Sequence, residues 1–301
     1  MADDLTIGFI GLGAMGNGMA RNVARKHAGP VLAFDLNPQA LAAVVAAGAK
    51  PAGSVAELAA AADVVLLSLP GGKQVHAVCG EIAEHGRAGA IVIDLSTTAV
   101  ADARGAARML QAAKGIAFAD APVARARAAA DAGTLSIMVG ASEALFARIE
   151  PILRTMGTDV NRCGEVGCGQ VVKLVNNTLL FEHVAALAEM AVVSERAGVS
   201  RETLFEVLAI SSADSFALRN HGMKAMLPRQ YPEKAFPSTY VLKDLCYAIE
   251  LAEQTGVEPR MPRLAAEYYQ AAIDCGRGEE YFPVIAEVVG EAEAGAPTGS
   301  A

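Results

Sequence analysis

Short, mainly apolar runs alternate with amphipathic stretches through the first half of the chain. Each run is followed directly by Gly, Asp or Pro, which favours a turn at that point. The runs occupy Leu5–Ile10, Val31–Phe34, Val64–Leu69, Ala90–Ile93, Ile116–Ala119 and Leu135–Val139. Such strands, separated by helices, are typical of a parallel sheet that helices cover on both faces. Right-handed crossovers then give a doubly wound α/β sheet.

The amphipathic stretches predict helices, first at Ala14–Lys26 and then at Pro38–Ala47. Pro38 suits a first helical turn, and Gly48 just past the end suits a helix terminus. The pattern changes after Gly164. From Gln170 to Arg196 the chain contains neither Pro nor Gly and predicts one long helix.

Further helices are predicted after the long one, and no convincing strand appears among them. They lie near Arg201–Ile210, Tyr240–Gln254, Arg263–Cys275 and Tyr281–Val289. We therefore predict an α/β domain at residues 1–163 and an all-helical domain at 164–291, which binds substrate and mediates oligomerisation. The tail at 292–301 is rich in Gly, Ala, Ser and Pro, and we expect it to be frayed.

The composition fits a well-packed protein, since 53% of the 301 residues are hydrophobic and 19% are charged. No uninterrupted apolar stretch of about 18 residues occurs, so we predict no membrane span. The start carries acids where a targeting segment would carry Lys or Arg, and we expect a cytoplasmic protein. The net charge is −8 and the Lys and Arg residues are scattered, which argues against a nucleic-acid partner.

The five cysteines are odd in number and form no C-x-x-C pair. We expect reduced, mostly buried thiols rather than disulfides or a zinc site. The five histidines are dispersed, and none stands with a second ligand at zinc-like spacing, so we predict no metal.

A glycine-rich segment directly follows the first predicted strand and opens the first helix. It reads Gly11-Leu12-Gly13-Ala14-Met15-Gly16, a G-x-G-x-x-G pattern. Gly11 would permit the tight turn, Gly13 the approach of the backbone to a pyrophosphate, and Gly16 close helix–strand packing. The helix N-terminus would present N–H groups to the phosphates. A plain glycine turn is the alternative, but the strand before and the helix after favour a dinucleotide site that also includes Ala14 and Met15.

Asp35 ends the second predicted strand, 22 residues after Gly13. A carboxylate there accepts hydrogen bonds from the adenine ribose and repels a 2′-phosphate. Leu36 and Asn37 follow, rather than an Arg that would neutralise such a phosphate, so we predict NAD rather than NADP. Asp35 could also cap the helix at Pro38. The ends of later strands should line the same crevice, which nominates Leu69, Pro70 and Asp94–Thr97, with Ser96 among them.

Lys173 and Asn177 lie four residues apart on the long helix and so project from one face. Their neighbours are apolar, so Lys173 is either a snorkelling surface residue or a partly buried amine. The glycines at 164, 167 and 169 permit close approach of a ligand or another segment and favour the buried amine. Such an amine can exchange a proton with a substrate hydroxyl while a hydride is transferred, and Asn177 would orient that hydroxyl.

At these residues the chain resembles the β-hydroxyacid dehydrogenase family, which includes 3-hydroxyisobutyrate dehydrogenases. The likeness runs from Ile7 to about Val289. Five blocks carry it: Gly8–Gly16, Asp94–Thr97, Asp120–Val123 with Gly133–Leu135, Gly167–Asn177, and Leu242–Leu245. The resemblance implies a Rossmann domain, a helical C-terminal domain and a site between them. It also implies Lys173 as catalytic acid/base, Asn177 as substrate binder and Lys243 near the nicotinamide. From the residues alone, Lys243 would instead be a solvated Lys paired with Asp244.

The chain departs from the family where members typically continue Asp-Ala-Pro-Val with Ser-Gly-Gly, which holds the substrate carboxylate. Here Val123 is followed by Ala124-Arg125-Ala126-Arg127. Arg binds oxyanions bidentately, so we predict Arg125 as an anion clamp in a substrate site with Ser96, Val123 and Ala124. Arg127 is expected on the surface. Sulfolactaldehyde reductases of this family resemble the sequence in having Arg at the position of Arg125.

Asp214 and Ser215 lie where the family has a Ser-rich loop that faces substrate, although simple helix capping explains them as well. The prediction is therefore an NAD-dependent dehydrogenase of a short 3-hydroxy acid or its semialdehyde, working as a homodimer or homotetramer. A sulfolactaldehyde or other semialdehyde reductase is the alternative. An imine reductase would lack Lys173, and a non-catalytic dinucleotide-binding protein would have no need of it.

Overall fold

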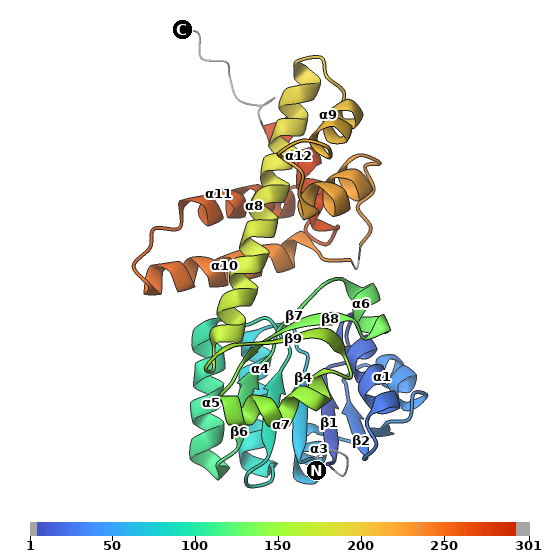
Figure 1. Ribbon diagram of the computed structural model, residues 1–301, viewed down its shortest axis with the longest axis vertical. Helices are drawn as coiled ribbons and strands as arrows, with labels where there is room; N and C mark the ends of the chain where they lie inside the picture. Colours follow the sequence, from blue (N-terminus) through green and yellow to red (C-terminus); the bar gives the residue numbers. More distant parts are fainter. Residues whose placement is uncertain (1–4, 234, 293–301) are drawn as a thin grey trace. The chain divides into compact units, whose positions relative to one another are not determined.

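The structure, a computed structural model, describes residues 5–233 and 235–292 (Figure 1). The chain divides into two compact units, Met1–Lys173 and Leu174–Ala301. The first unit thus extends past residue 163, the end of the predicted α/β domain, to include the start of a long helix. The predicted frayed tail lies outside the described residues except for Ala292, which ends the last helix.

A nine-stranded sheet forms the centre of the first unit. Its strands are β1 (Ile7–Ile10), β2 (Val31–Phe34), β3 (Lys50–Pro51), β4 (Val64–Leu67), β5 (Ile91–Asp94), β6 (Ala117–Asp120), β7 (Val123–Ala124), β8 (Leu135–Gly140) and β9 (Gly157–Gly164). They lie in the order β3-β2-β1-β4-β5-β6-β8-β7, with β9 on β8. The order reverses between β1 and β4, as in a Rossmann fold, and ligands bind outside the carboxyl ends of the strands at such a point.

The predicted parallel arrangement holds from β3 to β6 and is wrong for β8. That strand runs antiparallel to β6 and β7, while β9 runs parallel to β8. An apolar run predicts burial and not direction, so the sequence pattern could not reveal the reversal. The prediction also missed β9, because polar residues lie on both sides of Val160 and leave no apolar run.

Helices cover both faces of the sheet, which confirms the doubly wound prediction. They are α1 (Gly16–Lys26), α2 (Pro38–Val45), α3 (Val55–Ala61), α4 (Gly72–His85), α5 (Val100–Lys114), α6 (Arg127–Ala132) and α7 (Glu143–Leu153). Ile7 and Phe9 of β1 face one core, shared with α1, α2 and α7. Ile10 faces the other core, shared with α3, α4 and α5. Alternate residues of a strand point to opposite faces, so one apolar strand supplies both cores.

The register of the sheet brings several strand ends to one edge. Ile10 pairs with Phe34 on one side and Leu67 on the other, and Leu67 pairs with Asp94. The loops that follow β1, β2, β4 and β5 therefore emerge together, and these loops hold the polar and glycine residues predicted for the cofactor.

The second unit is helical, as predicted, and the described residues after Lys173 contain no strand beyond one isolated bridge between Pro237 and Tyr281. Helix α8 (Cys168–Arg196) continues from the first unit into it. The other elements are α9 (Arg201–Leu208), η2 (Leu218–Met226), α10 (Ser238–Gln254), α11 (Arg260–Asp274), η3 (Phe282–Val284) and α12 (Ile285–Ala292). Element η2 is a π-helix, which the sequence did not predict because its i→i+5 bonding breaks the 3.6-residue apolar period.

Helix α8 is long and apolar enough to span a membrane by length and composition. Its Phe181, Val184 and Ala188 are instead buried in the core of the second unit. Phe181 contacts the rings of Phe236, Tyr269 and Phe282, with centroids 5.5–6.0 Å apart. These apolar side chains of α8 therefore pack within the protein core.

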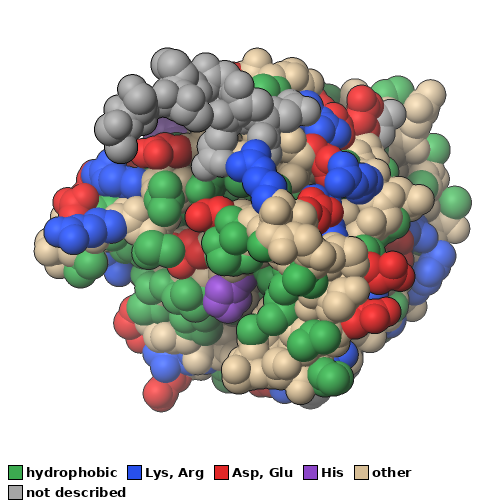
Figure 2. Space-filling model, turned by 90° about the horizontal axis from the view of Figure 1, so that it is seen from above, with side chains coloured by type: hydrophobic (Ala, Val, Ile, Leu, Met, Phe, Trp, Pro, Cys, Tyr) green, Lys and Arg blue, Asp and Glu red, His purple; other side chains and the backbone are tan. Residues whose placement is uncertain are grey.

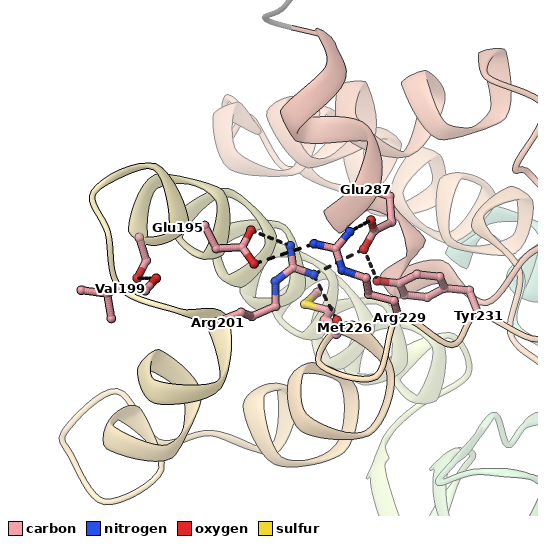
Figure 3. Close-up of polar contacts among 8 residues, drawn as sticks. Glu195, Val199, Arg201, Met226, Arg229, Tyr231 and Glu287 are labelled. Atoms are coloured by element: carbon pink, nitrogen blue, oxygen red, sulfur yellow. Dashed lines mark hydrogen bonds and ion pairs between the residues drawn. The ribbon is translucent and has the colours of Figure 1, made fainter.

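An ion-pair cluster around the buried Arg201 ties four helices of the second unit together (Figure 3). The guanidinium of Arg201, at the start of α9, lies 3.1 Å from Glu195 of α8 and 3.3 Å from Glu287 of α12. It also donates to the backbone oxygen of Met226 in η2 at 3.0 Å. Arg229 pairs with Glu287 at 2.7 Å. Desolvated charges are stable only when paired in this way, so the cluster holds the ends of α8, α9, η2 and α12 in place.

The cysteines are free thiols, but the prediction that most are buried is wrong. Of these five cysteines, all within the described residues, Cys79 alone is buried, whereas Cys246 of α10 and Cys275, which follows α11, are exposed. On the face drawn in Figure 2, Lys and Arg side chains are interspersed with acidic and apolar ones.

Candidate active site

The first glycine of the loop is required by the backbone. Gly11 has φ +91°, a region that favours glycine, and a Cβ there would lie 2.2 Å from the backbone oxygen of Ser68. A Cβ on Gly16 would lie 2.1 Å from the oxygen of Gly11. Both glycines therefore have the steric roles predicted for them, a tight turn and close packing of α1 against the loop.

Gly13 differs from its neighbours, because a Cβ there would meet nothing within 4 Å. Gly13 and Ala14 are exposed. Helix α1 begins three residues after Gly13 with no side-chain cap from Met15 and no acidic residue in its first turn. Open space next to an uncapped helix N-terminus fits an anionic group such as the pyrophosphate of a dinucleotide.

Asp35 lies against this loop. Its carboxylate accepts hydrogen bonds from the backbone N–H of Leu12 at 2.5 Å and of Asn37 at 2.7 Å. It does not cap α2, because the side chain of Asn37 does so by accepting from the N–H of Gln39. The half-buried carboxylate keeps lone pairs for ribose hydroxyls, and Leu36 beside it is fully exposed, with no cation in its place. This arrangement suits a cofactor without a 2′-phosphate.

The loops after β4 and β5 contact each other directly. The N–H of Leu69 donates to Oγ of Ser96 at 2.9 Å, and the N–H of Ser96 donates to Asp94 at 3.0 Å. Ser96 and Asp94 are both buried. The structure thus brings together Leu69, predicted for the cofactor, and Ser96, predicted for both cofactor and substrate.

Two residues that the sequence analysis assigned no role hold the start of α8. Asp120, fully buried at the end of β6, accepts from the N–H groups of Gly167 at 2.6 Å and Gln170 at 2.8 Å. Burial raises the pKa of Asp120 to about 6, although these hydrogen bonds lower it. Gln170, also fully buried, donates to the oxygen of Ser96 at 2.8 Å and accepts from the N–H of Thr98 at 3.2 Å. The sequence feature that could have suggested a role for Gln170 is its position one helical turn before Lys173.

Lys173 is only 9% exposed, so it is not a snorkelling surface residue. Asn177, four residues later on α8, is 5% exposed. The side-chain amide of Asn177 donates to Asp244 at 2.7 Å and accepts from Asn176 at 3.1 Å. An amine and an amide thus lie one helical turn apart, both shielded from water.

Lys243 pairs with Asp244 at 3.1 Å, as the solvated alternative predicted. However, Asp244 is buried and also binds Asn177, and the Lys243 ammonium lies 5.2 Å from the ring centroid of Tyr247. Lys243, Asp244 and Asn177 therefore form one chain of polar contacts within the second unit. The contact of Asp244 with Asn177 was not predictable from the sequence, in which Asp244 stands out only as a neighbour of Lys243.

Arg125 occupies an unusual backbone conformation, with φ +83°. Its guanidinium lies 2.7 Å from Asp159 and donates to the oxygen of Thr134 at 2.5 Å. Val123 and Ala124 before it pair with β8, and Arg127 is exposed, as predicted. Arg125 thus adopts a backbone conformation that favours glycine, and its side chain is bound within its own unit.

The loop at Asp214 and Ser215 caps the π-helix that follows it. Oγ of Ser215 accepts from the N–H of Leu218 at 3.0 Å, and Asp214 pairs with Arg219 at 2.7 Å. Among the residues that the structure describes, no group of three His, Cys, Asp or Glu side chains could hold a metal ion.

Comparisons with known proteins identify the family. Residues 6–167 match the family profile of the NAD-binding domain of 6-phosphogluconate dehydrogenase. Residues 167–288 match the NAD-binding domain of NADP-dependent 3-hydroxyisobutyrate dehydrogenase. The 2-(hydroxymethyl)glutarate dehydrogenase of Eubacterium barkeri is 36% identical, with 96% of each chain covered.

Two further relatives match over nearly their whole length. The NAD-dependent L-serine dehydrogenase of Pseudomonas aeruginosa is 34% identical, covering 93% of this chain and 96% of its own. The structure of the Mycobacterium tuberculosis 3-hydroxyisobutyrate dehydrogenase with L-serine superimposes with a TM-score of 0.85 at 29% identity, covering 94% of this chain and 98% of that one.

A Rossmann sheet, an open glycine loop with Asp35 beside it and a shielded Lys–Asn pair define an NAD-dependent oxidoreductase that acts on CH–OH groups. The chain belongs to the β-hydroxyacid dehydrogenase family. This confirms the fold, the cofactor and the reaction class predicted from the sequence, and the non-catalytic alternative is set aside.

Proposed function

We propose that the enzyme interconverts a short 3-hydroxy acid of the 3-hydroxyisobutyrate type and its semialdehyde, with Lys173 as the acid/base. The relatives named above act on 2-(hydroxymethyl)glutarate, L-serine and 3-hydroxyisobutyrate. All three compounds carry a hydroxymethyl group on the carbon next to a carboxylate. Substrates of the proposed class share this hydroxymethyl and carboxylate unit and differ in the other group on the carbon that joins the two.

The burial of Lys173 is the observation that carries the proposal. Bound NAD would supply the hydride acceptor. Oxidation of the alcohol also releases a proton from its oxygen, and the Lys173 amine would accept that proton at Nζ and return it in the reverse direction. Because Lys173 is only 9% exposed, bulk water does not compete for this exchange. Asn177, one turn away, would orient the hydroxyl, and Lys243 would lie near the nicotinamide.

The substrate carboxylate would be held by Ser96, Val123, Ala124 and Arg125. Arg125 is bound to Asp159, and both side chains are about half exposed. Exposed pairs of this kind contribute only about 0–1 kcal/mol, so an anionic substrate group can replace Asp159. A guanidinium also binds a sulfonate, which is why sulfolactaldehyde reduction is the second candidate activity.

A Lys173→Ala variant tests the main proposal. Loss of a general acid/base should lower kcat by about 10²- to 10⁴-fold with NADH binding retained. Lys50→Ala, on the exposed edge strand β3, is the matched control and should behave as wild type. Rates are followed by nicotinamide absorbance with 3-hydroxyisobutyrate, L-serine and 2-(hydroxymethyl)glutarate. Wild-type turnover in Lys173→Ala would refute the role.

A second variant separates the carboxylate and sulfonate candidates. Arg125→Ala should raise KM for the acid far more than it lowers kcat, because the residue binds an anion and moves no proton. Arg127→Ala is the control on the exposed surface. Comparing sulfolactaldehyde with carboxylate semialdehydes in wild type and Arg125→Ala shows which anion depends on the guanidinium. An unchanged KM for every acid would remove Arg125 from the site.

We further propose a cytoplasmic homodimer or homotetramer. Apolar side chains of α8, including Val175, Leu179 and Val193, are each more than 50% exposed, and exposed apolar groups of this kind often mark subunit contacts. Light scattering coupled to size-exclusion chromatography measures the assembly, and a monomer at micromolar concentration would contradict the proposal.

A further inference from the structure

A buried glutamine joins the first turn of α8 to the loop after β5. The side-chain nitrogen of Gln170 donates to the backbone oxygen of Ser96 at 2.8 Å. Its side-chain oxygen accepts from the backbone N–H of Thr98 at 3.2 Å. Gln170 is 0% exposed, so water cannot replace either contact. The side-chain amide of Gln170 thus bonds both the oxygen of Ser96 and the N–H of Thr98 in the loop after β5.

The same contacts continue to the neighbouring strand ends. Oγ of Ser96 accepts from the N–H of Leu69, after β4, at 2.9 Å. The backbone N–H of Gln170 donates to Asp120, at the end of β6, at 2.8 Å. Gln170 is therefore the residue at which the first turn of α8 is bonded both to β6 and to the connected loops after β4 and β5.

We propose that Gln170 is a positioning residue that fixes the Lys173 amine relative to Ser96 and Leu69. This inference rests on the role proposed for Lys173. Lys173 follows Gln170 by three residues and lies on the same side of the helix. Any rotation or slide of the first turn of α8 moves both residues together. A displacement of about 1 Å at a reacting group can cost about 10²-fold in rate, so a helix held only by apolar contacts would be a poor support.

The chemistry of the amide makes the proposal testable with one isosteric change. Ionised Glu at position 170 could still accept from Thr98 but could not donate to Ser96. Protonated Glu regains the donor and matches glutamine in shape and hydrogen bonding. Leu at this position removes both groups and leaves the Ser96 oxygen and the Thr98 N–H without their partner.

The experiment compares Gln170→Glu, Gln170→Leu and wild type, with Gln111→Glu as the control. Gln111 is exposed on α5 of the same unit, so its variant makes the same charge change without the buried contacts. We expect kcat of both Gln170 variants to fall by about 10²-fold, with KM for NAD and the hydroxy acid changing far less. The ratio of Gln170→Glu to wild-type kcat should rise as the pH falls, whereas the ratio for Gln170→Leu should not.

Thermal unfolding of each variant, measured at every pH, separates positioning from simple destabilisation. If the Gln170→Glu variant has wild-type kcat and an ordinary pH profile, or if its rate loss is pH-independent and follows only its Tm, the positioning role is wrong. Should Gln170→Leu fail to fold, the pH profile of Gln170→Glu decides alone. The Lys173→Ala variant is assayed beside them. If it retains activity, the proposed function fails; if it is inactive while Gln170→Glu is normal, only the inference about Gln170 fails.

Discussion

Two glycines of the loop after β1 are needed for different reasons, so substituting each of them should have a different effect. Gly11 is required by the fold, whereas Gly13 faces open space and, in the proposed site, is required only by the cofactor. The variants Gly11→Ala and Gly13→Ala should therefore separate stability from NADH binding.

For Gly11→Ala the cost follows from two observed features. Alanine at φ +91° is strained by about 1–3 kcal/mol. Its Cβ would also lie 2.2 Å from the oxygen of Ser68, which is backbone and cannot rotate away, and such overpacking costs about 1–3 kcal/mol more. The sum of about 2–6 kcal/mol lowers Tm by roughly 4–24 °C in a domain of this size.

For Gly13→Ala the expected effect is the reverse. Nothing lies within 4 Å of the new Cβ, so Tm should stay the same or rise slightly. The methyl group would instead occupy the space of the pyrophosphate and weaken one charged hydrogen bond, worth about 1.5–3 kcal/mol. That corresponds to a Kd for NADH raised by about 10- to 150-fold.

The measurements are thermal unfolding and a calorimetric titration with NADH. Gly80→Ala is the matched control, since a Cβ at this α4 glycine also meets nothing within 4 Å. It should leave Kd unchanged. If Gly13→Ala binds NADH as tightly as wild type, the pyrophosphate does not lie on this loop. An unchanged Tm for Gly11→Ala would contradict the turn geometry.

Three more outcomes are expected. Asp35→Ala should raise KM for NADH about tenfold and lower KM for NADPH, measured by steady-state kinetics; continued rejection of NADPH would contradict the repulsion argument. The pKa of Asp120 is raised from 3.8 to about 6, so the stability contributed by its protonated form is present below pH 4 and is lost as the pH rises to 6. The unfolding free energy of the wild type, measured in urea and compared with that of Asp120→Asn, should fall by about 3 kcal/mol over that range. A difference that stays constant with pH would refute the raised pKa. Arg201→Met should destabilise the protein by about 1–3 kcal/mol, because it removes the buried guanidinium that bonds Glu195, Glu287 and the oxygen of Met226 while Arg229 stays beside the two carboxylates; an unchanged Tm would show that the cluster is not stabilising.

Features with a local signature were predictable from the sequence. The strands β1, β2 and β4 to β6 were found because apolar runs ended at Gly, Asp or Pro. The glycine loop was found because its spacing follows from steric needs within six residues. Lys173 and Asn177 were paired because four residues of helix place them on one face.

Other features depend on residues far apart in the chain, and only the tertiary structure decided them. An apolar run has no direction, so the antiparallel course of β8 depends on which neighbour it meets. The contacts of Gln170 with Ser96, of Asp120 with Gly167 and of Arg125 with Asp159 join residues 34–74 positions apart. Partners so far apart in the chain show no periodicity or spacing in the sequence, because only folding brings them together. The sequence by itself therefore determined the cofactor loop, the candidate catalytic residue Lys173 and the class of reaction. The contacts of Gln170 and Asp120 near Lys173 were decided only by the tertiary structure, because the fold brings the ends of separate strands to one edge of the sheet.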